Sequence, residues 1–514
     1  MAGNLIHLPL GPLDHFAPRT YPGGVLYLKL KNGVTAQEAF KDLQEGLRRT
    51  IQQLPWLGGK VHWQSNDSPG WRPGQLEIRH LPVAAAEAVD AAPYQLRYNE
   101  LDTAPAYADM KARGFPIDSV RDEELLWAPF RADIDAGAEV FVAQANFIPG
   151  ACLLASSIIH VASDATAMFT VLGVWSQHCS YLHSSDERPK AALSDMPVQV
   201  TSESSDRTLL GKIWQKERSG RSIEQIDAGV WQLVGLESPK AEVASEQHGE
   251  GVARDKTGPQ SLPPAMFPAT NEPEKTMTSK VFYISPRSFA AMKKAANEEL
   301  GGTEVSGNDL ILALMWRGLM KARSAALQAS SEDQNRGVEI QIPVDGRPDF
   351  SQNGALPVTY LGNLNFHYRP SMVLGDLLAP STSLPAVAKR VRSCGLHVHH
   401  DNMLDAYTLL DNLPDFRATQ PLRFLDFDGT LLISSMLMVS DDLCFGARGP
   451  FANAGRPEGY RPMMSTRNLL KFRLCYVFPR KPHGGIEFMV SLMKDELEFL
   501  LKDEEFGRYA LLLA

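Results

Sequence analysis

The chain of 514 residues is 44% hydrophobic and 22% charged, the composition of a globular protein long enough for two domains of roughly 200 residues each. A net charge of -9 argues against a general nucleic-acid-binding protein, because such proteins carry a basic excess on the surface. Five cysteines without Cys-x-x-Cys spacing favour reduced thiols in the cytosol over disulfides or zinc ligands.

The N-terminal segment lacks the pattern of a signal peptide. Met1–Leu10 has no basic region, and Pro12 and Asp14 follow before a hydrophobic stretch develops. The longest apolar region, 140–175, is interrupted by a proline, a histidine and an aspartate, and does not fit a membrane span. We therefore expect a cytoplasmic protein that makes no contact with a membrane.

Strand and helix patterns alternate through the first half. Alternating residues over Gly24–Leu30 predict a half-buried strand, and helical spacing over Ala36–Leu54 predicts a helix that ends at a proline. Two apolar runs separated by Pro-Gly, Phe141–Phe147 and Ala151–Ile159, predict a hairpin. A helix over Asp164–His178 follows.

The second half repeats this mixed pattern after a long interruption. From about Ser238 to Thr278 the hydrophobic periodicity is lost, which predicts an exposed connector rich in Pro, Glu, Ser and Gly. Beyond it we predict strands at Lys280–Ile284, Val338–Val344, Leu431–Met436 and Gly485–Ser491, and helices at Pro286–Glu299, Gly307–Ala326 and Met493–Leu501. The chain is thus predicted to have an α/β fold built from two similar halves.

His160 stands where the buried strand Ala151–Ile159 ends, and Asp164 follows four residues later. A strand end holds a side chain rigidly at the floor of a cavity, where a neutral imidazole makes an effective general base near pH 7. Taken alone, the pattern fits a core histidine followed by a helix-capping aspartate at least as well. The function of His160 therefore depends on the other motifs.

Several further segments agree with a functional His160. The segments His160-Val-Ala-Ser-Asp164 and Asp442-Leu-Cys-Phe-Gly446 resemble the signature pair of the BAHD acyltransferases, His-x-x-x-Asp-Gly and Asp-Phe-Gly-Trp-Gly. Weaker matches keep the order of that family along the whole chain: Leu54–Lys60, Val305–Arg317, Val344–Arg347, Gly362-Asn363 and Gly484–Glu487. The chain is identified on these residues as resembling the fungal secondary-metabolism members of that family.

The chain departs from the family pattern at both signatures. Ala165 replaces a glycine, so a positive φ there would be costly and the channel beside His160 narrower. Leu443, Cys444 and Phe445 replace Phe, Gly and Trp of the second signature, and Met436 stands where the family has Trp. Met436 and Met438 would suit a bulky apolar substrate if they line the pocket, although core filling explains methionines equally well.

The resemblance implies two similar chloramphenicol-acetyltransferase-like domains, each a mixed sheet flanked by helices, facing each other across a tunnel. We assign 1–195 to the N-terminal domain, 196–279 to a crossover and connector, and 280–514 to the C-terminal domain, with about 370–412 a candidate to pack back onto the N-terminal domain. An acyl-CoA, most simply acetyl-CoA, would enter from one end and a small-molecule acceptor from the other. They would meet at His160.

The resemblance also implies roles for individual residues. His160 would be the general base, Asp164 would pair with Arg347, and Asp442 to Gly446 would form a structural turn. Ser434 or Ser435 would stabilise the oxyanion, although an ordinary strand hydroxyl is an equal alternative. Without a Gly-x-Ser-x-Gly elbow, direct attack in a ternary complex is favoured over an acyl-enzyme.

Two further groups of polar residues are candidates for binding a phosphate or a metal ion. Ser306 is a candidate contact for a CoA phosphate at a helix N-terminus, with a plain N-cap as its alternative. The cluster His397, His399 and His400 lacks acidic or cysteine ligands at matching spacing, so we expect a polar surface and no metal.

We therefore expect an acyl-CoA-dependent O-acyltransferase that moves a short acyl group to a hydroxyl of a polyketide, terpenoid or alkaloid, with N-acylation as the near neighbour. One alternative keeps His160 for an intramolecular condensation or cyclisation, and another is a non-catalytic binding protein. Peptide-synthetase condensation domains share the fold but usually have His-His where this chain has Ile159-His160. The family suggests a monomer, and the negative net charge argues against nucleic-acid partners.

Overall fold

The computed structural model describes residues 5–82, 93–102, 104–183, 198–218, 220–238, 277–302, 305–330, 332–352, 354–418, 430–440, 442–464 and 473–514. The predicted connector from 238 to 278 lies almost wholly outside these residues. Within the described ranges, every helix is too short or too polar to cross a membrane.

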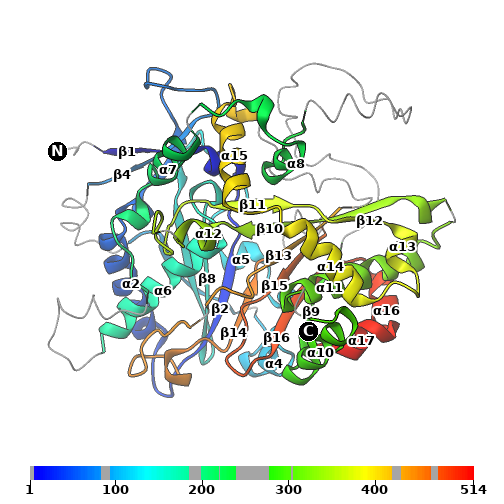
Figure 1. The fold of residues 1–514 in the computed structure, drawn as a ribbon. Coiled ribbons are helices and arrows are strands. Elements are labelled where there is room, and N and C mark those ends of the chain that lie inside the picture. The colour runs from blue at the N-terminus through cyan, green and yellow to red at the C-terminus, as the bar shows by residue number, and fades with distance from the viewer. Residues whose placement is uncertain are drawn as a thin grey trace, which may run out of the picture.

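The first half is built on a five-stranded sheet (Figure 1). Its strand order is β14 (Gly459–Pro462), β2 (Gly24–Lys29), β8 (Ala151–Ile158), β7 (Phe141–Ile148) and β5 (Leu96–Glu100). Helices α2 (Ala36–Gln53) and α6 (Ala165–Tyr181) pack against each other beside this sheet. A smaller sheet joins β1 (Ile6–Pro9), β4 (Leu76–His80), β3 (Lys60–Trp63) and β6 (Ala138–Glu139).

A larger mixed sheet forms the second half. Its order is β11 (Asn365–Tyr368), β10 (Gly337–Asp345), β13 (Thr430–Ser435), β15 (Leu474–Val477), β16 (Ile486–Leu492), β9 (Thr278–Ile284) and β17 (Ala510–Leu512), and β12 (Ser371–Val373) also pairs with β10. The pairs β10–β13 and β13–β15 are parallel, and the others are antiparallel. An apolar core lies between this sheet and its helices, which are α10 (Pro286–Leu300), α11 (Gly307–Ala326), α13 (Leu374–Leu378), α14 (Leu384–Gly395), α16 (Lys494–Lys502) and α17 (Glu504–Tyr509).

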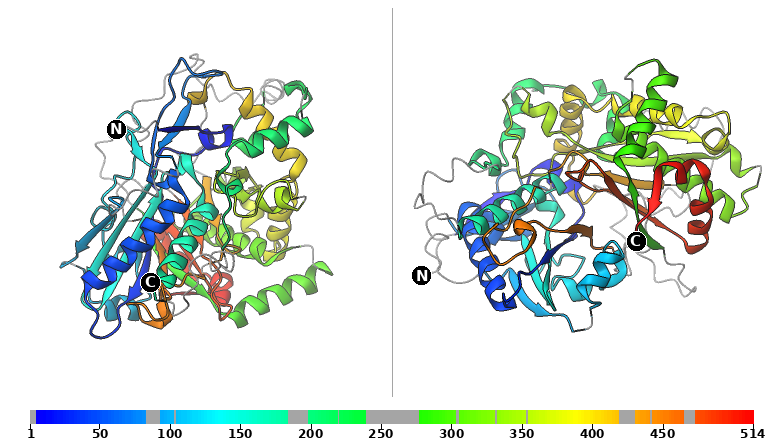
Figure 2. Two further views of the ribbon diagram at one scale, coloured as in Figure 1. Left: turned by 90° about the vertical axis from the view of Figure 1, so that its left-hand side faces the viewer. Right: turned by 90° about the horizontal axis from the view of Figure 1, so that it is seen from below.

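The two halves interlock and are not simply set side by side (Figure 2). Strand β14 comes from the second half of the chain yet pairs with β2 of the first sheet. Helix α15 (His400–Asp411) contacts α1 (Pro12–Phe16), α7 (Leu209–Arg218) and α8 (Ala228–Trp231). The remaining short helices are α4 (Tyr107–Ala112), α5 (Asp122–Leu125) and α12 (Arg347–Ser351).

The predicted helices and strands named above within the described residues are confirmed, except that β2 is buried over Gly24–Leu28 and is not the half-buried strand expected. The helix predicted over Gly307–Ala326 has those ends, and the predicted hairpin turns at Gly150, whose φ is +76°. The costly positive φ considered for Ala165 is not found, because Ala165 is the first residue of α6 and has no positive φ. Glycine's conformational freedom is therefore not needed at this position.

Candidate active site

A cavity of about 520 Å³ is lined by residues of both halves. One wall is a face of the large sheet, because side chains of alternate residues on a strand point the same way. This wall consists of Pro343, Asp345, Asn365, His367, Leu432, Ser434, Leu474 and Tyr476. The facing wall comes from α1, the loop that follows it, and the start of α6. The cavity has the size of a small-molecule site.

His160 begins the short 3-10 turn His160–Ala162 that follows β8, and its ring lines the cavity. Its Nδ1 is buried without a hydrogen-bond partner among the described residues, which leaves Nε2 as the nitrogen that can meet a substrate. Burial lowers the pKa of His160, and the nearby Asp164 carboxylate opposes this shift without outweighing it. The imidazole is therefore neutral near pH 7, the form that a general base requires.

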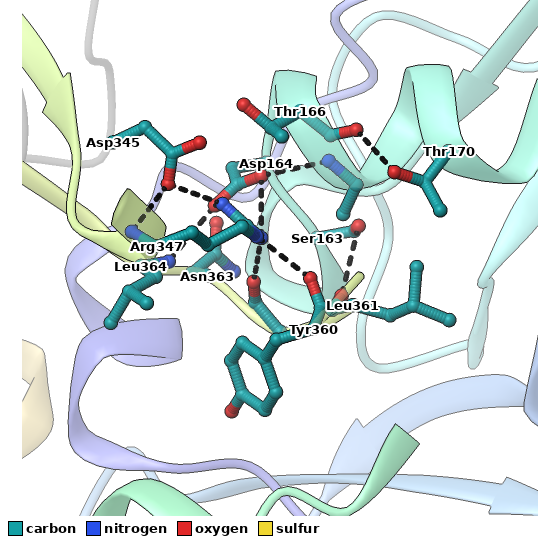
Figure 3. Close-up of polar contacts among 12 residues, drawn as sticks. Ser163, Asp164, Thr166, Thr170, Asp345, Arg347, Tyr360, Leu361, Asn363 and Leu364 are labelled. Atoms are coloured by element: carbon teal, nitrogen blue, oxygen red, sulfur yellow. Dashed lines mark hydrogen bonds and ion pairs between the residues drawn. The ribbon is translucent and has the colours of Figure 1, made fainter. Parts of the chain in front are cut away.

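Asp164, four residues after His160, pairs with Arg347 from the other half of the chain (Figure 3). The two terminal guanidinium nitrogens of Arg347, Nη1 and Nη2, contact the Asp164 carboxylate at 3.0 Å, and the two side chains are 3% and 0% exposed. The Asp164 carboxylate also caps α6 by accepting from the backbone N–H of Ala167 at 3.0 Å. It also accepts from the backbone N–H of Leu364 at 2.9 Å, so both carboxylate oxygens are hydrogen-bonded within the protein.

Backbone groups complete the arginine's environment. Arg347 donates to the carbonyls of Tyr360 and Gly362 at 2.8 and 2.7 Å, and Asp345 accepts a further bond at 2.8 Å (Figure 3). Although burial acts to lower it, the pKa of Arg347 is raised by the Asp164 and Asp345 carboxylates. Arg347 therefore stays charged in a buried position.

A second buried carboxylate, Asp14 of α1, holds the His160 turn from the other side. Its Oδ1 accepts from Arg207 at 3.2 Å and from the side chain of Asn363 at 3.0 Å. Asn363 in turn donates to the backbone carbonyl of His160 at 2.9 Å, and Arg207 donates to that of Ala162 at 2.6 Å. The carbonyls at the two ends of the turn are thus held by Asn363 and Arg207, and Asp14 accepts a hydrogen bond from each of these side chains.

Sequence reasoning missed Asp14 and Arg207, and noted Asn363 only as part of a family pattern. One signal for Asp14 was its place as the acidic residue of the otherwise mostly apolar stretch Leu10–Phe16. Arg207 lies in an ordinary polar segment, and its sequence context contains no comparable signal. It contacts a residue 193 positions away along the chain.

Ser434 and Ser435 both line the cavity. The Ser435 hydroxyl already donates to Asn308 at 2.6 Å, whereas that of Ser434 has no hydrogen-bond partner in the part of the chain that the structure describes. Met436 also lines the cavity, but Met438 is 92% exposed and does not belong to it. The expectation that both methionines form the pocket wall is therefore wrong for Met438.

The segment 442–446 lies away from the cavity and packs against α6. Phe445 meets Trp175 of α6 edge to face at 6.1 Å, and Gly446 has a φ of +100°, a conformation that favours glycine. Asp442 is exposed and pairs with Arg456. This turn from the second half of the chain thus contacts the same helix that Asp164 begins.

The cavity lining includes neither Ser306 nor the histidine cluster. Ser306 is the N-cap of α11, its hydroxyl accepts from the Asp309 N–H at 3.2 Å, and the Asp309 carboxylate already accepts from the Ser306 N–H. This geometry is that of a capping box. His397 and His399 are exposed, and His400 contacts Glu217 at 2.8 Å.

Removal of the buried arginine tests its structural role. We expect Arg347→Ala to lower the free energy of unfolding by about 3–5 kcal/mol, because it leaves the Asp164 carboxylate buried without its partner. Denaturant-induced unfolding followed by circular dichroism measures the change. The matched control is Arg456→Ala, which breaks the exposed pair with Asp442 and should cost less than about 1 kcal/mol. Equal effects of the two substitutions would contradict the assignment.

Comparisons with known proteins agree with this architecture. Residues 25–179 match the family model described as the trichothecene 3-O-acetyltransferase-like N-terminal domain. The chain is 28% identical over 506 residues to the eremophilane O-acetyltransferase prx11 of Penicillium rubens, covering 98% of both proteins. It is also 28% identical over 514 residues to the isocyanide synthase-NRPS hybrid crmA of Aspergillus fumigatus, covering 98% of this chain but only 31% of that protein.

Solved structures show the same fold. TRI101 of F. graminearum, complexed with coenzyme A and T-2 mycotoxin, is similar with a TM-score of 0.70 at 20% identity, over 99% of this chain and 100% of that one. Vinorine synthase is similar with a TM-score of 0.54 at 12% identity, over 97% and 94% of the two chains. The fold is therefore the two-domain chloramphenicol-acetyltransferase-like fold expected from the sequence. The chain is thus similar in sequence to fungal O-acetyltransferases and similar in fold to TRI101 and vinorine synthase.

Proposed function

We propose that this protein is an acyl-CoA-dependent O-acyltransferase that moves an acetyl or other short acyl group to a hydroxyl of a polyketide, terpenoid or alkaloid. The observation that carries the proposal is a neutral His160 at the wall of a cavity lined by both halves, on a turn fixed by two buried ion pairs. The names of the eremophilane O-acetyltransferases and of the TRI101 complexes support this reaction class.

In the proposed reaction His160 Nε2 removes the proton from the acceptor hydroxyl as the oxygen attacks the thioester carbonyl. A C–O bond forms, and Ser434 donates a hydrogen bond to the developing oxyanion. The C–S bond then breaks, and the CoA thiolate takes the proton from the imidazolium. Asp164 and Arg347 do not touch the substrates and act by positioning the turn.

The cysteines support direct attack over an acyl-enzyme. Cys152, Cys179 and Cys475 are buried, and burial raises the pKa of each thiol, that of Cys475 to about 12. A thiol with such a pKa supplies almost no thiolate at neutral pH. Cys444 lies in the turn against α6, and the cavity lining does not include it.

The lining of the cavity suits an apolar acceptor and an anionic donor. Aromatic side chains of Phe16, Phe130 and Phe169 line it. Arg19 and Arg131 also line it, although the chain as a whole is negatively charged. These guanidinium groups are better placed than Ser306 to meet the phosphates of a CoA thioester, because the N-terminus of α11 already binds the Asp309 carboxylate.

A second candidate keeps the fold and His160 but uses no external CoA, as in an intramolecular condensation or cyclisation. It is favoured by the hybrid synthase relative, of which this chain matches 31% and therefore one portion of a larger enzyme. Release of free CoA separates the two candidates.

His160→Ala should abolish most of the activity. We expect purified protein supplied with a panel of acyl-CoAs and hydroxylated metabolites to release CoA only with an acceptor, with a product mass increased by the acyl group. The substitution should lower kcat by about 10²–10⁴-fold because the proton acceptor is lost. Mass spectrometry and a thiol assay measure both products, and His397→Ala, at an exposed position, is the control.

Other outcomes of this assay point elsewhere. A product of unchanged or reduced mass without CoA release would favour the intramolecular reaction. If neither the wild type nor the variant turned over any donor, a binding protein would replace the enzyme as the better reading.

The rate should depend on the protonation of His160. Since burial lowers the pKa of this imidazole below its ordinary value of 6.5, the neutral base persists to lower pH than in a solvated histidine. We expect kcat/KM to rise with pH and reach its plateau after an inflection below 6.5. Initial rates across pH 4.5–8.5 measure the profile, and the residual activity of His160→Ala should lack the inflection. An inflection above 6.5 would contradict the model.

Asp14 should affect the rate without touching the substrate. Asp14→Asn removes the charge opposite Arg207 and weakens the hold on Asn363, so His160 loses part of its fixed position. We expect kcat to fall by up to about 100-fold while KM for acyl-CoA stays near that of the wild type. Asp206→Asn is the matched control, because Asp206 forms an exposed pair with Lys212 beside this network. If the control lost as much activity as Asp14→Asn, the positioning role would be refuted.

A further inference from the structure

A second imidazole shares the cavity with His160. His367 of β11 lines the cavity, and its ring lies 5.1 Å from that of Phe16 on the facing wall. His15 of α1 lines it too, but both of its ring nitrogens are used, one by the Gly11 carbonyl at 2.8 Å and one by the Leu76 N–H at 2.9 Å. His367 therefore differs from His15 in what it can offer a ligand.

The tautomer of His367 is set by Gln341. The side-chain amide N–H of Gln341, on the neighbouring strand β10, donates to His367 Nδ1. Because Nδ1 then accepts, the proton of the neutral ring resides on Nε2. Gln341 is fully buried, so this partner is not exchanged for solvent. Nε2–H is the group that His367 can present to a molecule in the cavity.

The ring stays neutral over the working pH range. Burial lowers the pKa of His367 to about 3, and the positive charges of Arg369 and, when protonated, His160 act in the same direction. A neutral N–H donor suits an uncharged oxygen, such as a carbonyl, ether or hydroxyl oxygen. A phosphate would instead meet Arg19 or Arg131.

The position of His367 relative to the reacting atoms follows from the strand. Asn363, which holds the His160 carbonyl, lies four residues before His367, at most about 14 Å along an extended chain. Asn365 stands between them on the same face. A ligand with a hydroxyl at His160 and an oxygen several bonds away spans this distance, as a fused-ring natural product does.

We propose that His367 is a specificity-determining residue that donates a hydrogen bond from Nε2 to an uncharged oxygen of the acceptor, remote from the hydroxyl that is acylated. Gln341 is its positioning residue. This role rests on the proposed function only in calling the ligand an acceptor, since binding can be measured without turnover.

Two substitutions of His367 separate the functional atoms of the ring. Gln places an amide nitrogen near the position of Nε2 and keeps the donor that faces the cavity. Asn places its amide near Nδ1, which keeps a partner for Gln341 but removes that donor. The pair tests the Nε2–H group while leaving a polar side chain in the sheet in both variants.

The experiment measures binding of two fused-ring probes by isothermal titration calorimetry: androsterone, a hydroxy ketone, and 5α-androstan-3α-ol, which lacks the ketone. We expect the wild type and His367→Gln to bind the ketone about tenfold more tightly, the worth of one hydrogen bond. His367→Asn should bind both probes equally. Thermal unfolding of all three proteins checks that they fold.

Several results would overturn the proposal. They are equal binding of the two probes by the wild type, a retained preference in His367→Asn, or a loss of preference in His367→Gln as well. A higher KM for acyl-CoA in His367→Asn, measured with an acceptor that turns over, would assign the residue to the donor instead. Failure of the proposed function would appear separately, as binding of the probes without any acceptor-dependent CoA release.

Discussion

The buried ion pair between Asp164 and Arg347 is the constraint on which the site depends. Two charges removed from water are stable only when each satisfies the other, and here every neighbouring bond reinforces that pairing. The pair fixes the first turn of α6 against the second half of the chain, four residues after the catalytic candidate. It therefore restrains the chain that follows His160.

A second charged contact acts on the opposite side of the same turn. Asp14 and Arg207 are almost fully buried, and together with Asn363 they hold the carbonyls of His160 and Ala162. The two ion pairs stabilise different parts of the backbone. The Asp164–Arg347 pair caps a helix, whereas the Asp14–Arg207 pair, with Asn363, holds backbone carbonyl oxygens. A turn restrained in this way needs little reorganisation when a substrate arrives, which is the basis of electrostatic preorganisation.

The interlocking of the halves explains how a cavity between them keeps its shape. Strand β14 returns to the first sheet, and the turn around Gly446 packs on α6, so the second half contacts α6 near both of its ends. Three histidines line this cavity, and they differ in which ring nitrogens already form hydrogen bonds within the protein. Burial lowers the pKa of all three, so their chemistry follows from which nitrogen remains available.

Much of this molecule follows from local sequence patterns. Hydrophobic periodicity and capping residues predicted the strand before His160 and the helix Gly307–Ala326, and motif order indicated a resemblance to acyltransferases and a candidate base. The Asp164–Arg347 contact was expected from resemblance alone. Such features depend on neighbours in the chain or on patterns shared with relatives.

Only the tertiary structure decided the rest. Asp14 contacts Arg207 and Asn363, which lie 193 and 349 residues away along the chain. Met438 is exposed to solvent, whereas Met436 lines the cavity. The Gln341 amide selects the tautomer of His367. No periodicity encodes these contacts, because each arises when distant elements pack and exclude water together. The sequence by itself determined the elements and pointed to the candidate base, and long-range packing determined which polar groups surround it.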